Sequence, residues 1–206
     1  SSKNPIIISG GGVFYSDAME ELSKFAIKHN IPVTQTVMGY STMKRDHSHY
    51  AGQIGGLGGK NTNLLAKKTD LALAVGTKLA DFTTGSWANF ENESFKLVSI
   101  NVSRFDANKH LAQAVVGDAK VSLDDLSLAL GDWKAGEEWN KKSQAELKVW
   151  NEYVDKECAP SNQEVPSYVQ VIGAIYKNSD PSDIAVTAAG GLVGEVIQVW
   201  RPRELN

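Results

Sequence analysis

The chain has 206 residues, a formal net charge of −3 and 42% hydrophobic residues, so it can bury one good core, or one core and part of a second domain. The net charge is small and the sequence contains no run of basic residues, which argues against nucleic acid and anionic membranes as partners. No apolar stretch approaches the roughly 18 residues of a spanning helix, and the first residues do not resemble a signal peptide, so we expect a cytoplasmic protein.

Residues 5–12 read PIIISGGG, which predicts a strand followed by a glycine turn, and the apolar spacing over residues 17–29 predicts a helix. Gly10, Gly11 and Gly12 have two interpretations. They could let a phosphate approach the helix N-terminus, or they could form a tight turn beneath the helix. The dinucleotide fingerprint is incomplete because Tyr15 occupies its third glycine position, so the sequence gives little support for a nicotinamide-linked dehydrogenase.

Residues 38–59 form a long polar and glycine-rich connection. His47 and His49 form an H-x-H pair that could ligate a metal, but no third ligand of clear spacing accompanies them, which favours a solvated loop. Gly59-Lys60-Asn61 does not complete a phosphate-binding P-loop, because Ile54 stands where that motif needs a glycine. A short helix is expected over residues 61–68.

Residues 70–87, DLALAVGTKLADFTTGSW, contain the clearest signal in the chain. Five uninterrupted apolar residues, 71–75, predict a central strand of a parallel sheet that is buried on both faces. Gly76, Thr77 and Lys78 then open a polar turn over residues 77–85, at the edge where open α/β sheets place their ligands. Together with the three glycines after the first strand, they make up the predicted nucleotide groove.

Two further strands are predicted, at residues 96–101 and 114–116, with a turn at 103–106 and a helix at 120–130. We expect Val121, Leu123, Leu126, Leu128 and Leu130 to give that helix a broad apolar face. With strands at 5–9, 32–36 and 71–75 this makes five, and we expect a sixth. The alternation of strands and helices predicts a doubly wound, mostly parallel α/β domain over residues 1–132.

Residues 133–166 are expected to form an amphipathic helix at about 137–157, with Trp139, Leu147, Trp150 and Val154 along one side, and a linker at 159–166. The lone cysteine, Cys158, is interpreted as an inert thiol. Residues 167–206 begin a second unit with a helix, a strand at 184–187 and a second helix. These elements cannot close a core, so the tail either packs on the main domain or belongs to a longer protein, which we favour.

Several of these stretches resemble, in order and spacing, the middle domain of thiamine-diphosphate enzymes of the acetolactate-synthase group. They are GGGVFYSDAMEELSKFAIKHNIPVTQT, QIGGLGG, VGTKLADFTTGSW, SINVSRFDANKH and VVGDAK. Within that group, VGTKLADFTTGSW, INVSRFDANKH and VTAAGGLVGEVIQVWR look closest to the trihydroxycyclohexane-1,2-dione acylhydrolases of inositol catabolism. The resemblance covers about residues 4–203 and implies a Rossmann-like central domain followed by the truncated start of the cofactor-binding C-terminal domain.

The resemblance further implies a parent enzyme that uses thiamine diphosphate and Mg²⁺ to open a cyclic 1,2-diketone to 5-deoxyglucuronate. Its partners would be the missing N- and C-terminal domains, and the parent would be a homodimer or homotetramer with active sites between subunits. The family's G-D-G motif for the diphosphate and the metal is absent, because Ala119 follows Gly117-Asp118 and Trp133 follows Gly131-Asp132. We therefore expect this chain to contain no catalytic or metal-binding residue, to bind no thiamine diphosphate and to be inactive alone.

Flavin-binding relatives have a G-A-R-F-D-D-R rim where this chain has residues 76–82. Lys78 replaces the arginine of that rim, and a lysine cannot reproduce the planar fork of a guanidinium. Asn101 stands where the next strand usually offers an aspartate. These departures favour an empty or vestigial nucleotide groove over bound FAD.

Two other functions remain open from the sequence. One is a lyase or carboligase that acts on 2-oxo acids within the same superfamily. The other is a stand-alone nucleotide-binding module of similar sheet architecture, because a fold by itself does not determine function.

Overall fold

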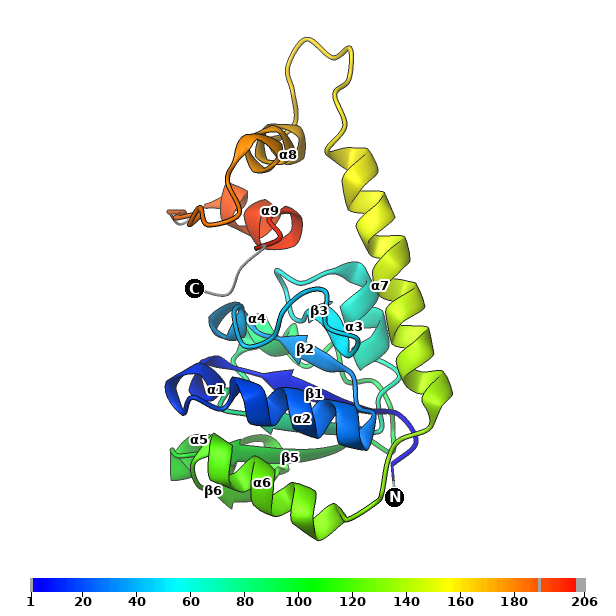
Figure 1. The fold of residues 1–206 in the computed structure, drawn as a ribbon, viewed down its shortest axis with the longest axis vertical. Helices are drawn as coiled ribbons and strands as arrows, with labels where there is room; N and C mark the ends of the chain where they lie inside the picture. Colours follow the sequence, from blue (N-terminus) through cyan, green and yellow to red (C-terminus); the bar gives the residue numbers. More distant parts are fainter. Residues whose placement is uncertain (1, 189, 203–206) are drawn as a thin grey trace.

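The computed structural model describes residues 2–188 and 190–202 and contains one six-stranded sheet in which every neighbouring pair is parallel. The strand order is β3-β2-β1-β4-β5-β6, so the chain winds outward in both directions from a central pair (Figure 1). The strands are β1 Pro5–Ser9, β2 Val33–Gln35, β3 Tyr50–Gln53, β4 Leu71–Val75, β5 Lys96–Asn101 and β6 Gln113–Val116. The predicted doubly wound α/β fold is confirmed.

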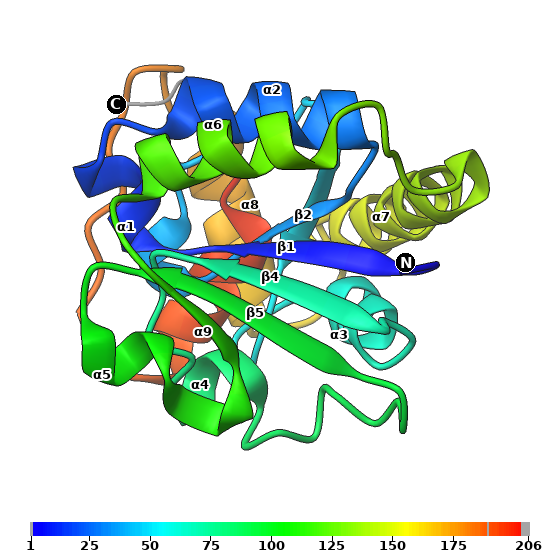
Figure 2. The same cartoon turned by 90° about the horizontal axis from the view of Figure 1, so that it is seen from below.

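Helices cover both faces of the sheet. α2 and α6 lie side by side on one face, and α3 and α4 lie toward the other (Figure 2). The α-helices are α1 Gly11–Tyr15, α2 Met19–His29, α3 Lys60–Ala66, α4 Asp81–Thr84, α5 Arg104–Ala107, α6 Ala119–Leu130, α7 Glu137–Glu157, α8 Tyr168–Asn178 and α9 Gly191–Val199. Two 3₁₀ turns, η1 Val37–Gly39 and η2 Lys109–Leu111, complete the described elements.

The two central strands supply apolar side chains to both layers. In β1, Ile7 packs into the core beneath α2 and α6, whereas Ile6 and Ile8 pack into the core on the opposite face. Successive residues of a strand point to opposite faces, so a strand covered on both sides has to be apolar throughout. β4 follows the same rule, with larger side chains toward the α2 and α6 layer and alanines toward the other.

The sixth strand lies in a segment that the sequence analysis interpreted as an irregular connection. β3 pairs with β2 through Val33 and Tyr50, and with a register shift through Gln35 and Gln53. Tyr50 is only 2% exposed. The sequence YAGQ has no apolar run, and its burial comes from α3 and α7, which pack against β3. The prediction of a continuous loop over residues 38–59 was therefore wrong.

The predicted helices and turns need correction at three places. The helix expected over residues 17–29 begins at Met19, and a separate short helix, α1, precedes it. The turns expected at 77–85 and 103–106 contain α4 and most of α5. In α6, Leu123 is buried, but Val121 and Leu128 are 59% and 77% exposed, so its apolar face is narrower than predicted.

α7 connects the sheet to the C-terminal helices. Trp139 near its start is buried, and its indole Nε1 donates to the Pro5 carbonyl at 2.8 Å. Near its end, Val154 packs with Ile172 of α8 and Val199 of α9. This agrees with the predicted amphipathic helix. Within the described residues, no helix is long and apolar enough to cross a membrane.

The C-terminal helices also contact the sheet domain directly. The Tyr40 hydroxyl donates to the Trp200 carbonyl, and burial raises the pKa of Tyr40 to about 12. Arg45 donates to the Ile197 carbonyl at 3.3 Å, and on the other side Arg201 forms an ion pair with Asp155 of α7 at 2.9 Å. The tail therefore packs on the rest of the chain, which is one of the two alternatives that the sequence left open.

The strand expected at residues 184–187 is absent from the described part of the structure. Ile184 and Val186 are 75% and 90% exposed, and no strand pairs with this segment. A β-branched segment forms a strand only where another strand offers hydrogen-bond partners, and none does so here. The prediction was therefore wrong for this structure.

The narrow apolar face of α6 predicts unequal effects of two leucine substitutions. Leu123→Ala should lower the free energy of unfolding by about 2–5 kcal/mol, because it leaves a cavity in the core. Leu128→Ala on the same helix should change it by less than about 0.5 kcal/mol, because that side chain is exposed. Urea unfolding followed by circular dichroism measures both, and equal losses would contradict the packing described here.

Candidate functional site

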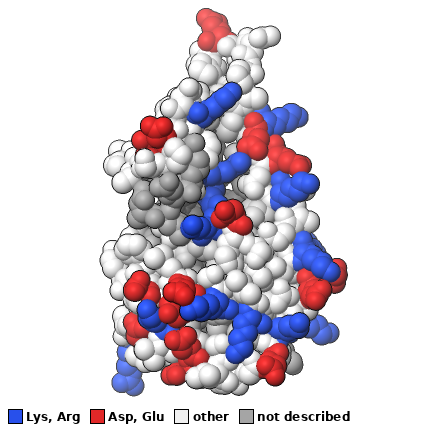
Figure 3. Space-filling view, viewed as in Figure 1, with Lys and Arg blue, Asp and Glu red and all other residues white. Residues whose placement is uncertain are grey.

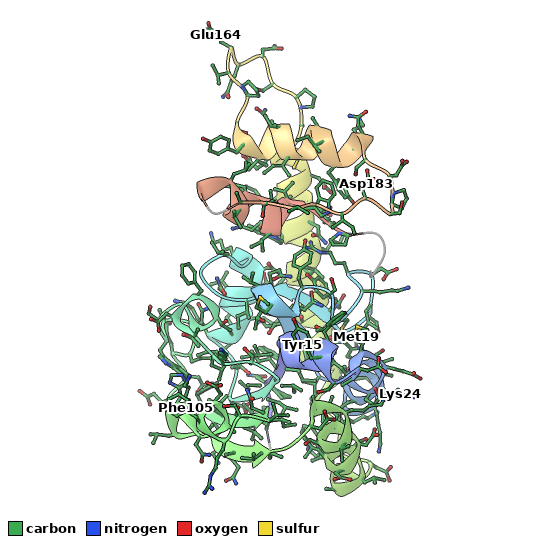
Figure 4. All side chains as sticks on the ribbon, turned by 90° about the vertical axis from the view of Figure 1, so that its left-hand side faces the viewer. Tyr15, Met19, Lys24, Phe105, Glu164 and Asp183 are labelled. Atoms are coloured by element: carbon green, nitrogen blue, oxygen red, sulfur yellow. The ribbon has the colours of Figure 1, made fainter. Side chains whose placement is uncertain are left out.

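The carboxyl ends of the strands form one edge of the sheet, which faces the viewer in Figure 4, with Tyr15 of α1 and Phe105 of α5 projecting from it. The first three residues of the predicted groove follow β1, and the other three follow β4. These two strands are neighbours, and Ser9 is in register with Val75. The topology therefore places both glycine turns where the chain reverses its winding direction, the usual ligand position in this class of sheet.

Four of the six predicted residues come into direct contact. A Cβ atom added to Gly12 would lie 2.6 Å from the Gly76 Cα, and one added to Gly10 would lie 2.5 Å from the Thr77 Cβ. Gly76 itself has φ +60°, a conformation that favours glycine. Both turns therefore need glycine so that their backbones can pack against each other.

Gly11 and Lys78 are placed differently. A Cβ on Gly11 would approach the Met38 carbonyl oxygen at 3.1 Å rather than the β4 turn. The Lys78 side chain is exposed and makes no ion pair with any described residue. It is the one cation of the predicted set, and it lies beside the glycine contact.

Backbone hydrogen bonds join the two turns. The Gly10 N–H donates to the Val75 carbonyl, and the Gly12 N–H donates to the Gly76 carbonyl, both at 2.9 Å. The Val13 N–H donates to the Gly10 carbonyl at 3.1 Å. Three of the amides at the start of α1, those of Gly10, Gly12 and Val13, are thus already used within the protein and do not point at a phosphate. This supports the tight-turn interpretation of the three glycines, and nucleotide binding here stays a prediction.

Asn101, the residue at the aspartate position of the flavin-binding relatives, is also used internally. Its side-chain Nδ2 donates to the Thr77 carbonyl at 3.0 Å, and its Oδ1 accepts from the Ser103 N–H at 2.9 Å. The side chain is 9% exposed. It fixes the turn after β4 to the end of β5. Both the nitrogen and the oxygen of its side-chain amide are thus already hydrogen-bonded within the protein.

Sequence reasoning missed a row of buried polar side chains at the ends of β1, β2 and β3. The Ser9 hydroxyl donates to Thr42 Oγ1 at 2.6 Å, and Gln35 donates to the same oxygen at 3.3 Å. Gln53 donates to Gln35 Oε1 at 3.4 Å. Ser9 and Gln35, like Gln35 and Gln53, are in register on neighbouring strands. Polar residues ending consecutive strands were the available signal, but β3 had not been recognised.

The H-x-H pair lies just before β3 and is largely enclosed. His47 Nε2 lies 2.9 Å from the Ser23 hydroxyl of α2, and His49 Nε2 lies 3.1 Å from Asn30 Oδ1. Burial lowers the pKa of both rings, and the neighbouring His47 further lowers that of His49. His49 is 8% exposed, so the expectation of a solvated loop was wrong at this residue. The pair has a structural role in joining α2 to β3.

The two Gly-Asp dipeptides have different roles. Asp118 caps α6, since its Oδ1 accepts from the N–H groups of Lys120 and Val121 at 2.9 and 3.3 Å. Asp132 is exposed in the turn after α6. Among the residues that the structure describes, no group of three or more His, Cys, Asp or Glu side chains could hold a metal ion.

Comparison with known families shows which family the chain resembles. The sequence profile described as "Thiamine pyrophosphate enzyme, central domain" matches residues 1–126. This range contains all six strands and ends within α6.

Comparison with curated proteins extends the similarity to the whole chain. The chain is 35% identical to the 3D-(3,5/4)-trihydroxycyclohexane-1,2-dione hydrolase of Clostridium tetani over 99% of its length, and 34% identical to that of Geobacillus thermodenitrificans over 100%. A hydrolase of the same name from Clostridium perfringens is 33% identical over 97% of the chain. The chain spans about a third of the length of these relatives, since it covers 35% of each.

The contact between the glycine turns predicts a stability loss on the smallest possible substitution. Gly12→Ala should lower the free energy of unfolding by about 1–3 kcal/mol, because the new Cβ would overlap the backbone of Gly76. Gly191→Ala is the matched control, since its Cβ would meet open space at the start of a helix. Chemical denaturation of both variants tests this, and a neutral Gly12→Ala would show that the turns do not pack as described.

The enclosed histidines predict a loss of stability in mild acid. Their pKa values are lowered on folding, so the unfolded chain binds more protons as the pH falls through the ordinary histidine value of about 6.5. The free energy of unfolding should therefore be highest above that pH and decrease as the pH falls below it. Denaturant titrations between about pH 7.5 and 5.5 measure the slope. The double variant His47→Gln/His49→Asn should flatten it, and an unchanged slope would contradict the assignment.

Proposed function

Because the chain belongs to the family of thiamine pyrophosphate enzyme central domains, we propose that it is the central domain of a longer thiamine-diphosphate-dependent hydrolase. The substrate that we propose is trihydroxycyclohexane-1,2-dione, opened to 5-deoxyglucuronate in myo-inositol catabolism. One observation carries the proposal. The similarity to hydrolases of that name continues through 97–100% of the chain, well beyond the residues matched by the family profile.

The proposed role of this chain within the enzyme is to hold other parts in place. In such an enzyme, thiamine diphosphate supplies a nucleophilic carbon that adds to a carbonyl of the substrate, and the protein supplies orientation and electrostatics. Asp118 caps a helix, and the rim glycines pack on each other, which supports a domain that binds no thiamine diphosphate and is inactive alone. The reacting groups would then come from domains beyond this segment.

We propose three parts for the chain. Residues 1–132 are the central domain, residues 133–166 are the helix and linker, and residues 167–206 begin the C-terminal domain of the enzyme. The last assignment is supported by the exposed apolar segment around Ile184 and Val186, which has the composition of a strand without a neighbour. The N-terminal and the remaining C-terminal domains would be its partners, in a parent homodimer or homotetramer.

We further propose that the groove between the turns after β1 and β4 contains no FAD. The hydrogen bonds of Gly10, Gly12 and Asn101 support this, because they leave few free donors for a diphosphate or a ribose. Lys78 remains exposed, but a single point charge gives little specificity for a dinucleotide.

Two measurements test the proposed function. The longer polypeptide that contains this domain should hydrolyse trihydroxycyclohexane-1,2-dione in the presence of thiamine diphosphate and Mg²⁺, with the ring-opened acid as product. Calorimetry on the 206-residue chain should detect no tight binding of thiamine diphosphate. Turnover of 2-oxo acids but not of the cyclic diketone would overturn the substrate, and tight cofactor binding by the chain would overturn its role.

A further inference from the structure

Four buried polar atoms without a hydrogen-bond partner lie where the C-terminal helices meet the sheet domain. They are Arg45 Nε, Tyr50 Oη, Gln53 Oε1 and Arg201 Nε, half of the eight such side-chain atoms within residues 2–188 and 190–202. Tyr50 and Gln53 are only 2% and 5% exposed. Buried polar groups nearly always have a partner in folded proteins, so we expect a water molecule or an ion to complete these hydrogen bonds.

A small cavity lies beside these atoms and has a volume of about 10 Å³. Arg45, Tyr50 and Gln53 line it from the sheet domain, and Ile197 and Gln198 line it from α9. That volume accommodates about one particle of the size of a water molecule. The cavity therefore excludes a nucleotide or a substrate, and its occupant has to be a single water molecule or a monatomic ion of comparable size.

The charge around the cavity is positive. The guanidinium of Arg45 lies over the rings of Tyr40 and Tyr50, 5.1 and 5.9 Å from their centroids. It forms no ion pair within the described part of the chain. The second guanidinium, that of Arg201, is paired with Asp155 at 2.9 Å. One positive charge is thus left without a counter-charge, and its Nε is buried, which is costly unless an anion compensates it.

Donors outnumber acceptors among the four atoms. The Nε atoms of Arg45 and Arg201 each carry an N–H group, and the hydroxyl of Tyr50 can rotate to donate. Burial raises the pKa of Tyr50, although the two nearby guanidiniums lower it, so the hydroxyl remains protonated at neutral pH. A water molecule would need acceptors as well, and Gln53 Oε1 is the one available at this place. The excess of donors and the positive charge favour an anion over water.

We propose that Arg45 Nε and the Tyr50 hydroxyl bind one monatomic anion of the chloride type, with Arg201 beside it. Arg45 and Tyr50 belong to the sheet domain, whereas Arg201 follows α9 and is tied to the Asn151 carbonyl in the cavity wall at 3.2 Å. The anion therefore joins α9 to the sheet domain. On the face shown in Figure 3, positive and negative side chains are interspersed, so a general positive field on that face does not explain selective anion binding.

Urea unfolding of the 206-residue chain at constant ionic strength tests the proposal, with sodium chloride exchanged stepwise for sodium gluconate. A ligand that binds only the folded state raises the folding equilibrium constant in proportion to its concentration above the dissociation constant. Each tenfold increase in chloride above that constant should therefore raise the folding equilibrium constant by up to tenfold. Gluconate is too large for the cavity and should not do so. A wild-type chain that shows no dependence on chloride would overturn the proposal and leave a water molecule as the occupant.

Two variants with matched controls locate the effect. Tyr50→Phe removes one donor and keeps the ring, so it should raise the chloride dissociation constant at least tenfold, whereas Tyr153→Phe removes the hydroxyl of an exposed tyrosine and should leave it unchanged. Arg45→Met should abolish the dependence, and Arg104→Met, at an exposed arginine, should keep it. Arg45→Met also removes a hydrogen bond to α9, so Tyr50→Phe is the decisive variant. Equal chloride dependence in Tyr50→Phe and the wild type would contradict the site, even if the variant is less stable.

Crystals grown in sodium bromide give a direct readout, because bromide replaces chloride and scatters X-rays anomalously near its absorption edge. One anomalous peak should lie within hydrogen-bond distance of Arg45 Nε and the Tyr50 hydroxyl, and it should be lost in Tyr50→Phe crystals. Electron density for a water molecule at this place, without an anomalous peak, would overturn the proposal.

Discussion

The close approach of two backbone turns at the centre of the sheet is the constraint on which the rest of the structure depends. The Gly12 N–H donates to the Gly76 carbonyl, and neither residue has room for a Cβ atom. Because β1 and β4 are central neighbours, this contact fixes where α1 begins and where the chain leaves β4. A larger residue in either turn would push the two halves of the doubly wound sheet apart.

That contact also shapes the rim of the sheet. In many sheets of this class, glycines after the first strand leave room for a phosphate. Here the same space is occupied by the chain itself, and the ends of β1, β2 and β3 are joined by the hydrogen bonds of Ser9, Gln35 and Gln53. Buried hydrogen bonds of this kind are costly to break, and within the described residues only Gln53 Oε1 of this row is buried without a partner. The rim is therefore held together by hydrogen bonds within the chain.

The sequence predicted the elements whose signal is local. The five apolar residues of β4 and the periodicity of α7 were both recognisable, because burial on two faces and burial on one face leave different patterns. β3 was missed because its burial comes from tertiary contacts, such as that of Gln144 with the Tyr50 carbonyl at 2.9 Å. The strand prediction for residues 184–187 was wrong for the opposite reason, since this segment has the sequence of a strand but no described strand lies beside it to pair with. The glycines of the site were visible in the sequence, but their contact with each other was not.

α7 links the sheet to the C-terminal helices through contacts at both of its ends. Its first turns are fixed to the sheet by Trp139, which donates to the Pro5 carbonyl, and its last turns hold α8 and α9 through Val154. Asp155 and the Asn151 carbonyl, both in α7, bind Arg201, which follows α9. On the other side, the Trp200 carbonyl accepts from the hydroxyl of Tyr40 in the sheet domain. The C-terminal helices are thus held from two sides, by α7 and by the loop after β2. A displacement of α9 would have to break both sets of contacts, so these contacts fix α9 relative to both the sheet and α7.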